Sequence, residues 1–240
     1  MLPKYRLMLV ILVIGLAFPL RSGTGSAQAT PTANEICPPF IAVGAATPAS
    51  DSGSPVDIDP ATLEFDQLFL EAMVPHHEMT ILIAQVGRDR TERSELTAFA
   101  DTLIAGRQAE AKTMREWRGG WYEDSPMLSE DQLIRGMNAK LSENPGMGGV
   151  AGIEDIGVEH MAAELSEFCA AGNESDLRFI DLMLAHHSSA IVLGQEAVTR
   201  GLHQELRELA SAIVATQQYE VDQLLTWREI WYEGAPFPEH

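Results

Sequence analysis

The stretch Met73-Val74-Pro75-His76-His77 returns later in the chain as Met183-Leu184-Ala185-His186-His187. The two copies lie 110 residues apart, and together they hold four of the seven histidines. The same offset holds without a gap beyond the motif, and it relates Trp117-Arg118 to Trp227-Arg228. A repeat of this length indicates a duplicated structural unit built around a Met-His-His helix.

Apolar residues around the first motif recur at steps of three and four, which is typical of an amphipathic helix. Asp59-Pro60 is a common helix start, and the helix is predicted to end near residues 87–90. A second helix is predicted from about residue 91 to 122, and the short connection makes the pair an antiparallel hairpin. The offset predicts a second hairpin over about 176–200 and 202–232. Because no strand pattern is found, we predict an all-α bundle of two repeated helical hairpins with extra linker helices.

The chain divides into five predicted segments. Residues 1–29 combine a basic start, an apolar run shorter than a membrane span and a cleavage site at Ala27-Gln28-Ala29, as in a signal peptide. An uncleaved N-terminal anchor is the alternative. The others are a flexible lead-in (30–60), the first hairpin repeat (61–126), linker helices (127–174) and the second hairpin repeat (175–236). Within the linker, Ser129-Glu130-Asp131-Gln132 predicts a capping box.

The 240 residues carry a net charge of −19. Such a charge argues against nucleic acid and anionic membrane surfaces as partners. It is compatible with a protein that gathers cations, although ordinary solubility is the simpler interpretation. No stable membrane insertion is expected once the signal peptide has been removed.

Cys37 and Cys169 are the only two cysteines. In an exported protein an even pair predicts a disulfide, here between the lead-in and the helix before the second repeat. Two free thiols, or thiolate metal ligands, are the alternatives.

Met, His and Glu on facing helices form a set of metal ligands. Met73, His76 and His77 share one helix face, and the hairpin brings Glu110 and Met114 opposite them. Thioether sulfur favours Cu(I), imidazole suits copper or zinc, and carboxylate adds a hard oxygen. The candidate ligands are Met73, His76, His77, Glu110, Met114, Met183, His186, His187 and Glu220.

A single His or Met at helical spacing is more often core than ligand, but the repetition of the whole set favours metal binding. Leu224 replaces Met114 in the second copy, so that half lacks one sulfur. The residues without a repeat partner are expected to be structural. They are the surface residues His160, His203 and His240 and the core residues Met137, Met147 and Met161. The paired tryptophans are most simply packed helix ends, with cation–π contacts as the alternative.

These motifs resemble a known family. Phe-x-x-x-Met-x-x-His-His, followed by Gln-x-Glu-x-x-x-Met-x-x-Trp, is similar to the pattern of the domain-of-unknown-function 305 family. The matching residues are Phe69, Met73, His76, His77, Gln108, Glu110, Met114 and Trp117, and in the second copy Phe179, Met183, His186, His187, Gln218, Glu220, Leu224 and Trp227. The resemblance covers about 61–126 and 175–236 as two tandem copies.

The resemblance implies a ferritin-like helical fold and an exported bacterial protein associated with copper binding and copper tolerance. It implies no established enzymatic activity, and the departure at Leu224 leaves the ligand set of the second half incomplete.

We therefore predict a secreted or periplasmic protein that binds and sequesters copper through Met and His on facing helices, with Glu assisting. Copper, as Cu(I) or Cu(II), is favoured over zinc, and a binding protein is favoured over an enzyme. The alternatives are a copper-dependent redox enzyme and a metal-free helical interaction module. A di-iron oxidase is disfavoured because neither repeat carries a Glu-x-x-His pair. One shared site or one per repeat, and the presence of a homo-oligomer, are left open.

Overall fold

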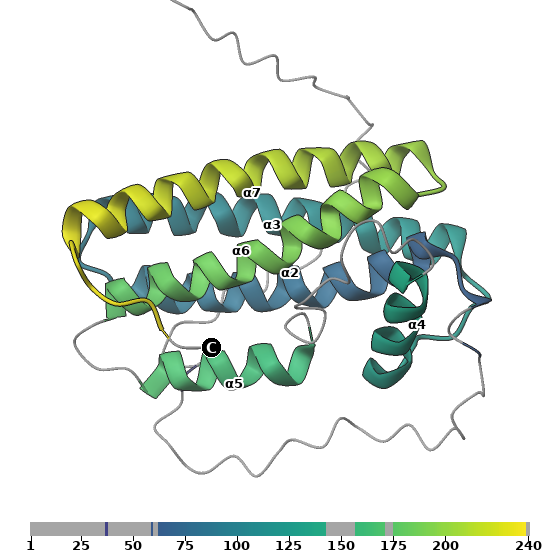
Figure 1. Cartoon of the computed structure of the whole chain (residues 1–240), viewed down its shortest axis with the longest axis horizontal. Helices are drawn as coiled ribbons and strands as arrows, with labels where there is room; N and C mark the ends of the chain where they lie inside the picture. Colours follow the sequence, from purple (N-terminus) through teal and green to yellow (C-terminus); the bar gives the residue numbers. More distant parts are fainter. Residues whose placement is uncertain (1–36, 38–58, 60–61, 143–156, 171–174, 239–240) are drawn as a thin grey trace, which may run out of the picture. The chain divides into compact units, whose positions relative to one another are not determined.

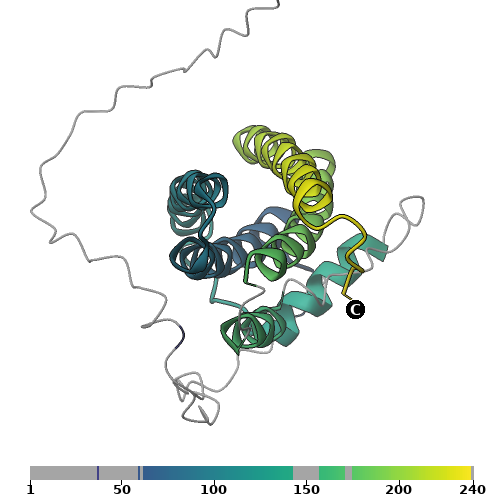
Figure 2. The ribbon, with the colours of Figure 1, turned by 90° about the vertical axis from the view of Figure 1, so that its left-hand side faces the viewer.

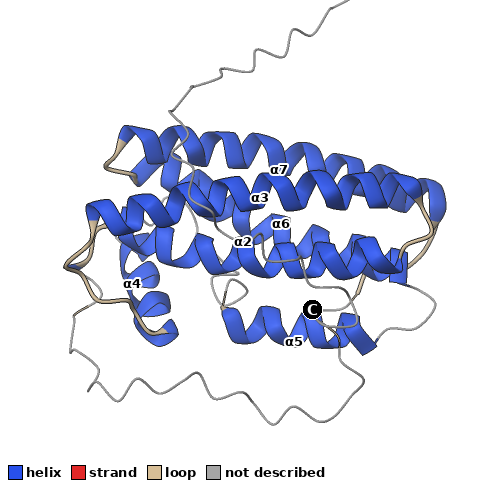
Figure 3. Cartoon of the chain, turned by 180° about the vertical axis from the view of Figure 1, so that it is seen from behind, coloured by secondary structure: helices blue, strands red, loops and turns tan. Residues whose placement is uncertain are grey.

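The computed structural model describes residues 37, 59, 62–142, 157–170 and 175–238. These residues form six helices and no strand, which confirms the all-α prediction (Figure 3). The helices are α2 (Phe65–Arg90), α3 (Ser94–Trp121), α4 (Glu130–Ser142), α5 (Val158–Ala170), α6 (Ser175–Arg200) and α7 (Gln204–Trp231). The predicted signal peptide, most of the predicted lead-in, Met147 and His240 lie outside the described residues.

Helices α2 and α3 form one antiparallel hairpin, and α6 and α7 form the other (Figure 1). Helices α2 and α6 lie side by side between the outer pair α3 and α7 and the linker helices α4 and α5 (Figure 2). The two hairpins therefore meet along the helices that carry the two His-His pairs. Within the described part of the chain, no helix has the length and hydropathy needed to span a membrane.

The ends of the predicted helices are partly corrected. Helix α2 begins at Phe65, later than Asp59-Pro60 predicts, because the Asp59 carbonyl accepts hydrogen bonds from the amide and hydroxyl of Thr62 in a separate turn. Helix α2 also continues through Pro75 to Arg90. The predicted capping box is confirmed: the Ser129 amide donates to Gln132 Oε1 at 2.9 Å and the Gln132 amide to Ser129 Oγ at 3.3 Å.

The apolar core has two parts, one toward each end of the bundle. One includes Phe69 and Met73 of α2 and Leu206 of α7; the other includes Phe179 of α6 and Leu103 of α3. Between these parts each of the four long helices contributes buried polar residues, which we call the polar layer. Its buried members are His76, His77, Thr80, Arg107, His186, His187, Gln217 and Glu220, and we include the half-buried Glu110. Burying polar groups at the centre of a bundle is unfavourable unless they bind one another or a ligand.

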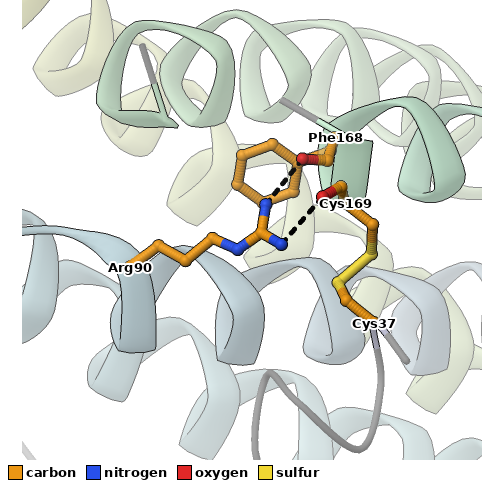
Figure 4. The surroundings of a disulfide bond; sticks show 4 residues. All are labelled: Cys37, Arg90, Phe168 and Cys169. Carbon is orange, nitrogen blue, oxygen red and sulfur yellow. Dashed lines mark hydrogen bonds between the residues drawn. A yellow bond between two sulfur atoms is a disulfide. The ribbon is translucent and has the colours of Figure 1, made fainter. Parts of the chain in front are cut away.

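Two equivalent arginines hold the linker helices. Arg90 donates to the Phe168 and Cys169 carbonyls at the end of α5, both at 2.8 Å (Figure 4). Arg200, which is its repeat partner, donates to the Lys140 carbonyl of α4 at 2.9 Å. These bonds satisfy carbonyls that a helix end leaves without an intrahelical partner.

The predicted disulfide joins Cys37 to Cys169. It therefore adds a covalent attachment at the end of α5 where Arg90 also binds (Figure 4).

Gly87 lets α2 and α6 approach closely, because a Cβ there would lie 2.5 Å from the buried ring of Phe179. Gly87→Ala is expected to lower the free energy of unfolding by about 1–3 kcal/mol, since the buried ring of Phe179 would have to shift. Gly106→Ala, in a helix position with nothing within 4 Å, is expected to raise it by about 0.5–1 kcal/mol. Urea unfolding of both variants measures the difference, and equal effects would contradict the close packing.

Candidate metal centre

The two His-His pairs face each other across the contact between α2 and α6. All four side chains are buried. The ring centroids of His76 and His186, which come from different hairpins, are 5.4 Å apart, and those of His76 and His77 are 6.2 Å apart. The fold thus brings the two sequence motifs into one cluster at the centre of the bundle.

One histidine of each pair is hydrogen bonded to the glutamate predicted beside it. His77 Nε2 lies 2.7 Å from Glu110 Oε2, and His187 Nε2 lies 2.8 Å from Glu220 Oε2. The two contacts are equivalent under the repeat. Because an ionised carboxylate only accepts hydrogen bonds, each glutamate holds its histidine with the proton on Nε2.

Arg107 connects the two halves of the polar layer. It is 1% exposed, and its guanidinium donates to Glu110 Oε2 at 3.1 Å and also to Glu220 Oε2. The repeat partner of Arg107 is Gln217, so a single cation serves both carboxylates. Sequence reasoning missed this residue. The sequence feature that could have identified it is a basic residue three positions before Glu110, at a position where the second repeat has Gln217 instead.

The remaining pair of histidines has different neighbours. His76 Nε2 is 3.3 Å from Ser189 Oγ, whose hydroxyl donates to the His186 carbonyl at 3.0 Å. His186 Nε2 lies 3.0 Å from Glu164 Oε2 of α5, close enough for an ion pair but without hydrogen-bond geometry. Neither Ser189 nor Glu164 was among the residues selected from the sequence.

The Nδ1 atoms of all four histidines are buried and have no hydrogen-bond partner among the described residues. A buried polar atom without a partner is unfavourable by about 1–3 kcal/mol and is rare in native structures. A proton on Nε2, as the Glu110, Glu220 and Ser189 contacts favour, leaves a lone pair on Nδ1. These lone pairs can accept a cation, so the residues present fit a metal that binds neutral imidazole.

Burial favours the neutral form of His76, His77 and His187. It lowers the pKa of His76 well below the usual value of 6.5, and the neighbouring His186 lowers it further. Burial also lowers the pKa values of His77 and His187, although Glu110 and Glu220, and for His187 the Met183 backbone, oppose the shift. Burial acts to raise the pKa of Glu110, but the hydrogen bond from His77 and the charge of Arg107 outweigh it, so that pKa is lowered.

The predicted sulfur ligands are buried beside the polar layer. Met73 and Met114 belong to the same part of the apolar core, whereas Met183 packs in the other part together with Leu224. Among the described residues, no three His, Cys, Asp or Glu side chains are grouped so that they could hold a metal ion by themselves. The thioethers and the four imidazoles therefore stay predicted ligands, while Glu110 and Glu220 are occupied by His and Arg107 in this structure.

The other sequence expectations have mixed outcomes. Met137 and Met161 are fully buried and His160 is exposed, as predicted. The prediction that His203 is a surface residue was wrong. The ring of His203 stacks on that of Trp121 with their centroids 3.8 Å apart, and its Nδ1 atom is hydrogen bonded to Asp66 of α2. The tryptophans at the helix ends are partly buried in both hairpins, and Arg93 also lies 4.2 Å above the Trp231 ring.

Comparison with known proteins agrees with this architecture. The profile of the domain-of-unknown-function family DUF305 matches residues 66–228. The chain belongs to the DUF305 family. One match covers both hairpins of this DUF305 protein at once, so a tandem duplication of the family domain stays a hypothesis. No match was found among curated proteins.

Solved structures are similar to this DUF305 protein over most of their length. CopM in the Cu(I)-bound form is 25% identical with a TM-score of 0.51, and the match covers 70% of this chain and 97% of CopM. CopM in the Cu(II)-bound form is 27% identical with the same TM-score and coverage. A DUF305 protein from Streptomyces coelicolor, described as secreted, is 22% identical with a TM-score of 0.57 and shares the fold over 74% of this chain and 98% of its own.

Arg107→Met is expected to lower the free energy of unfolding of the metal-free protein by about 3–5 kcal/mol, because it leaves two largely buried carboxylates without their cation. Arg115→Met is the matched control, since Arg115 pairs with Glu78 at the surface and is worth at most about 1 kcal/mol. Chemical unfolding of both variants tests the difference. A loss no larger for Arg107 than for Arg115 would show that Arg107 does not hold the layer together.

The metal-free protein is expected to lose stability as the pH falls from about 7 to about 5. The pKa values of His76, His77 and His187 are lower in the folded state than in the unfolded chain, so the unfolded chain binds more protons in this range. Urea midpoints at several pH values measure the effect. His76→Gln should reduce the pH dependence, and an unchanged dependence would contradict the assignment to His76.

Proposed function

We propose that this protein binds copper in the polar layer and sequesters or handles it outside the cytoplasm. The observation that carries the proposal is that each of the four histidines, two from each hairpin, has a buried Nδ1 atom without a hydrogen-bond partner among the described residues, and that the rings of His76 and His186 from different hairpins lie 5.4 Å apart. The similarity to CopM, whose structures contain Cu(I) and Cu(II), supports the same ligand class.

Imidazole nitrogens and thioether sulfurs are the donors we assign. Neutral imidazole and thioether are a soft set that suits Cu(I). Met73 and Met183 lie one helical turn before the histidines, on the same helix faces. Met114 adds a sulfur in the first half only, so we expect the two halves to contribute unequally.

Charge balance favours a monovalent ion. With neutral imidazoles, Glu110, Glu220 and Arg107 leave the layer with one net negative charge. A single Cu(I) ion would balance this charge within the layer. In this proposal Glu110, Glu220 and Arg107 orient the histidines instead of binding the metal directly, a role that typically changes metal affinity by about 10–100-fold.

We also propose an extracytoplasmic location. A disulfide between Cys37 and Cys169 is typical of proteins that fold in an oxidising compartment. The signal-like sequence of residues 1–29 supports the same location.

Replacing His76, His77, His186 and His187 together by Gln is expected to abolish retention of copper. The experiment loads the protein with Cu(I), Cu(II) or Zn(II), removes free metal by desalting and measures the metal that remains by elemental analysis. Circular dichroism checks that the variant is still helical. Unchanged metal content in the variant would overturn the site, and a wild type that retains no metal would favour the interaction module.

A second pair of variants tests the sulfur ligands. Met73→Leu with Met183→Leu should weaken Cu(I) binding, because leucine keeps the volume and removes the thioether. Met137→Leu with Met161→Leu is the matched control, since both side chains are fully buried outside the polar layer. Equal affinities of the two double variants would remove the thioethers from the ligand set.

A further inference from the structure

Two cavities on the face of the linker helices are related by the repeat. The α5-side cavity, of about 800 Å³, is lined by Asp181, Ala185, Phe237 and Pro238 among others. The α4-side cavity, of about 440 Å³, is lined by the repeat partners Glu71, Pro75, Met127 and Leu128. The two cavities therefore lie at equivalent positions in the two halves. Helix α5 covers one of them and helix α4 covers the other.

The two α2 carboxylates of the α4-side cavity pair with arginine, as Asp181 of the α5-side cavity pairs with Arg228. Arg118 Nε donates to Glu71 Oε1 at 2.6 Å, and Arg115 binds Glu78. No histidine is among the described residues that line this cavity. A cation in the α4-side cavity would therefore find no imidazole among the described lining residues, and both α2 carboxylates there are already paired with arginine.

The α5-side cavity has a histidine and a carboxylate that lead into the protein. Glu164 Oε1 lies 3.6 Å from His160 Nε2, and Glu164 Oε2 lies 3.0 Å from His186 Nε2. The exposed fraction of these side chains decreases along the series, from 49% for His160 through 20% for Glu164 to 2% for His186. The next ring inward is that of His76, whose centroid lies 5.4 Å from the centroid of the His186 ring.

The inner end of this series points to a ligand. His186 is buried, and neither of its ring nitrogens has a hydrogen-bond partner among the residues that the structure describes. Its Nε2 atom is close to Glu164, and its Nδ1 atom belongs to the set assigned above to the metal. The ring of His186 therefore lies between Glu164 on the cavity side and His76 of the polar layer.

We propose that His160 and Glu164 form a transient cation site at the mouth of the α5-side cavity, through which Cu(I) reaches His186 and the polar layer. This inference rests on the proposed copper function. A site of one imidazole and one carboxylate holds a soft cation weakly, because it has no sulfur donor, so the ion passes on to the thioether-rich interior. The negative charge of Glu164 raises the local concentration of cations.

The attachment of α5 supports this role. Arg90 and the Cys37–Cys169 disulfide hold the end of α5 that follows Glu164 (Figure 4). The position of Glu164 relative to His186 is thus set by contacts independent of the metal.

The rate of Ag(I) loading tests the entrance separately from the site. Silver(I) serves as the probe because it has the charge and ligand preference of Cu(I) and needs no reductant, so the disulfide stays closed. Loading of the metal-free full chain is followed by stopped-flow fluorescence of the tryptophans, and the final silver content is measured after desalting.

Glu164→Gln and His160→Gln are each expected to slow loading by about tenfold, within the range of charge-steered association, and to leave the final silver content unchanged. Glu78→Gln, at the mouth of the α4-side cavity, is the matched control and is expected to load at the wild-type rate.

Wild-type rates in both α5 variants would overturn the entrance, as would equal slowing by Glu78→Gln. A lower final silver content in Glu164→Gln would make Glu164 a ligand of the buried site and would also overturn it. A wild type that retains no silver would overturn the proposed function, and the entrance with it.

Discussion

The structure depends on one buried cation, Arg107, which binds glutamates from both hairpins. Each glutamate holds a histidine, so the guanidinium indirectly positions one ring on α2 and one on α6. A buried carboxylate without a cation is unfavourable, and two arginines at this place would repel each other. The replacement of the second arginine by Gln217 is therefore what allows two similar halves to share one centre. An exact repeat would place a second arginine at residue 217, where it would repel Arg107.

The same asymmetry recurs outside the polar layer. The two cavities occupy equivalent places and each has a carboxylate paired with arginine, but among the described lining residues a histidine is found only in the α5-side cavity, where Glu164 also lies close to His186. The difference comes from the linker, because α4 covers one cavity and α5 covers the other. The proposed entrance for a cation therefore lies on the α5 side of the bundle and not on the α4 side.

Most of the fold could be predicted from local pattern. The three- and four-residue spacing around Met73 predicts α2, and the repeat predicts α6 and α7 at the right places. The Ser129 capping box was also correct, since it depends on residues three apart. The start of α2 was wrong, because Asp59 uses its carbonyl in a separate turn with Thr62 and does not cap the helix. For the centre, the His pairs and their glutamates were found, whereas Arg107, Glu164 and Ser189 were not.

The sequence by itself determined the all-α class, the two hairpins and the face of each helix that carries histidine, because helical spacing and the 110-residue offset are properties of the chain alone. Only the tertiary structure decided that the two His-His pairs form one cluster, that Arg107 neutralises both glutamates and that Glu164 of α5 reaches His186. These contacts join residues far apart in the chain. Their geometry is set by how α2, α5 and α6 pack, and no local spacing encodes that packing.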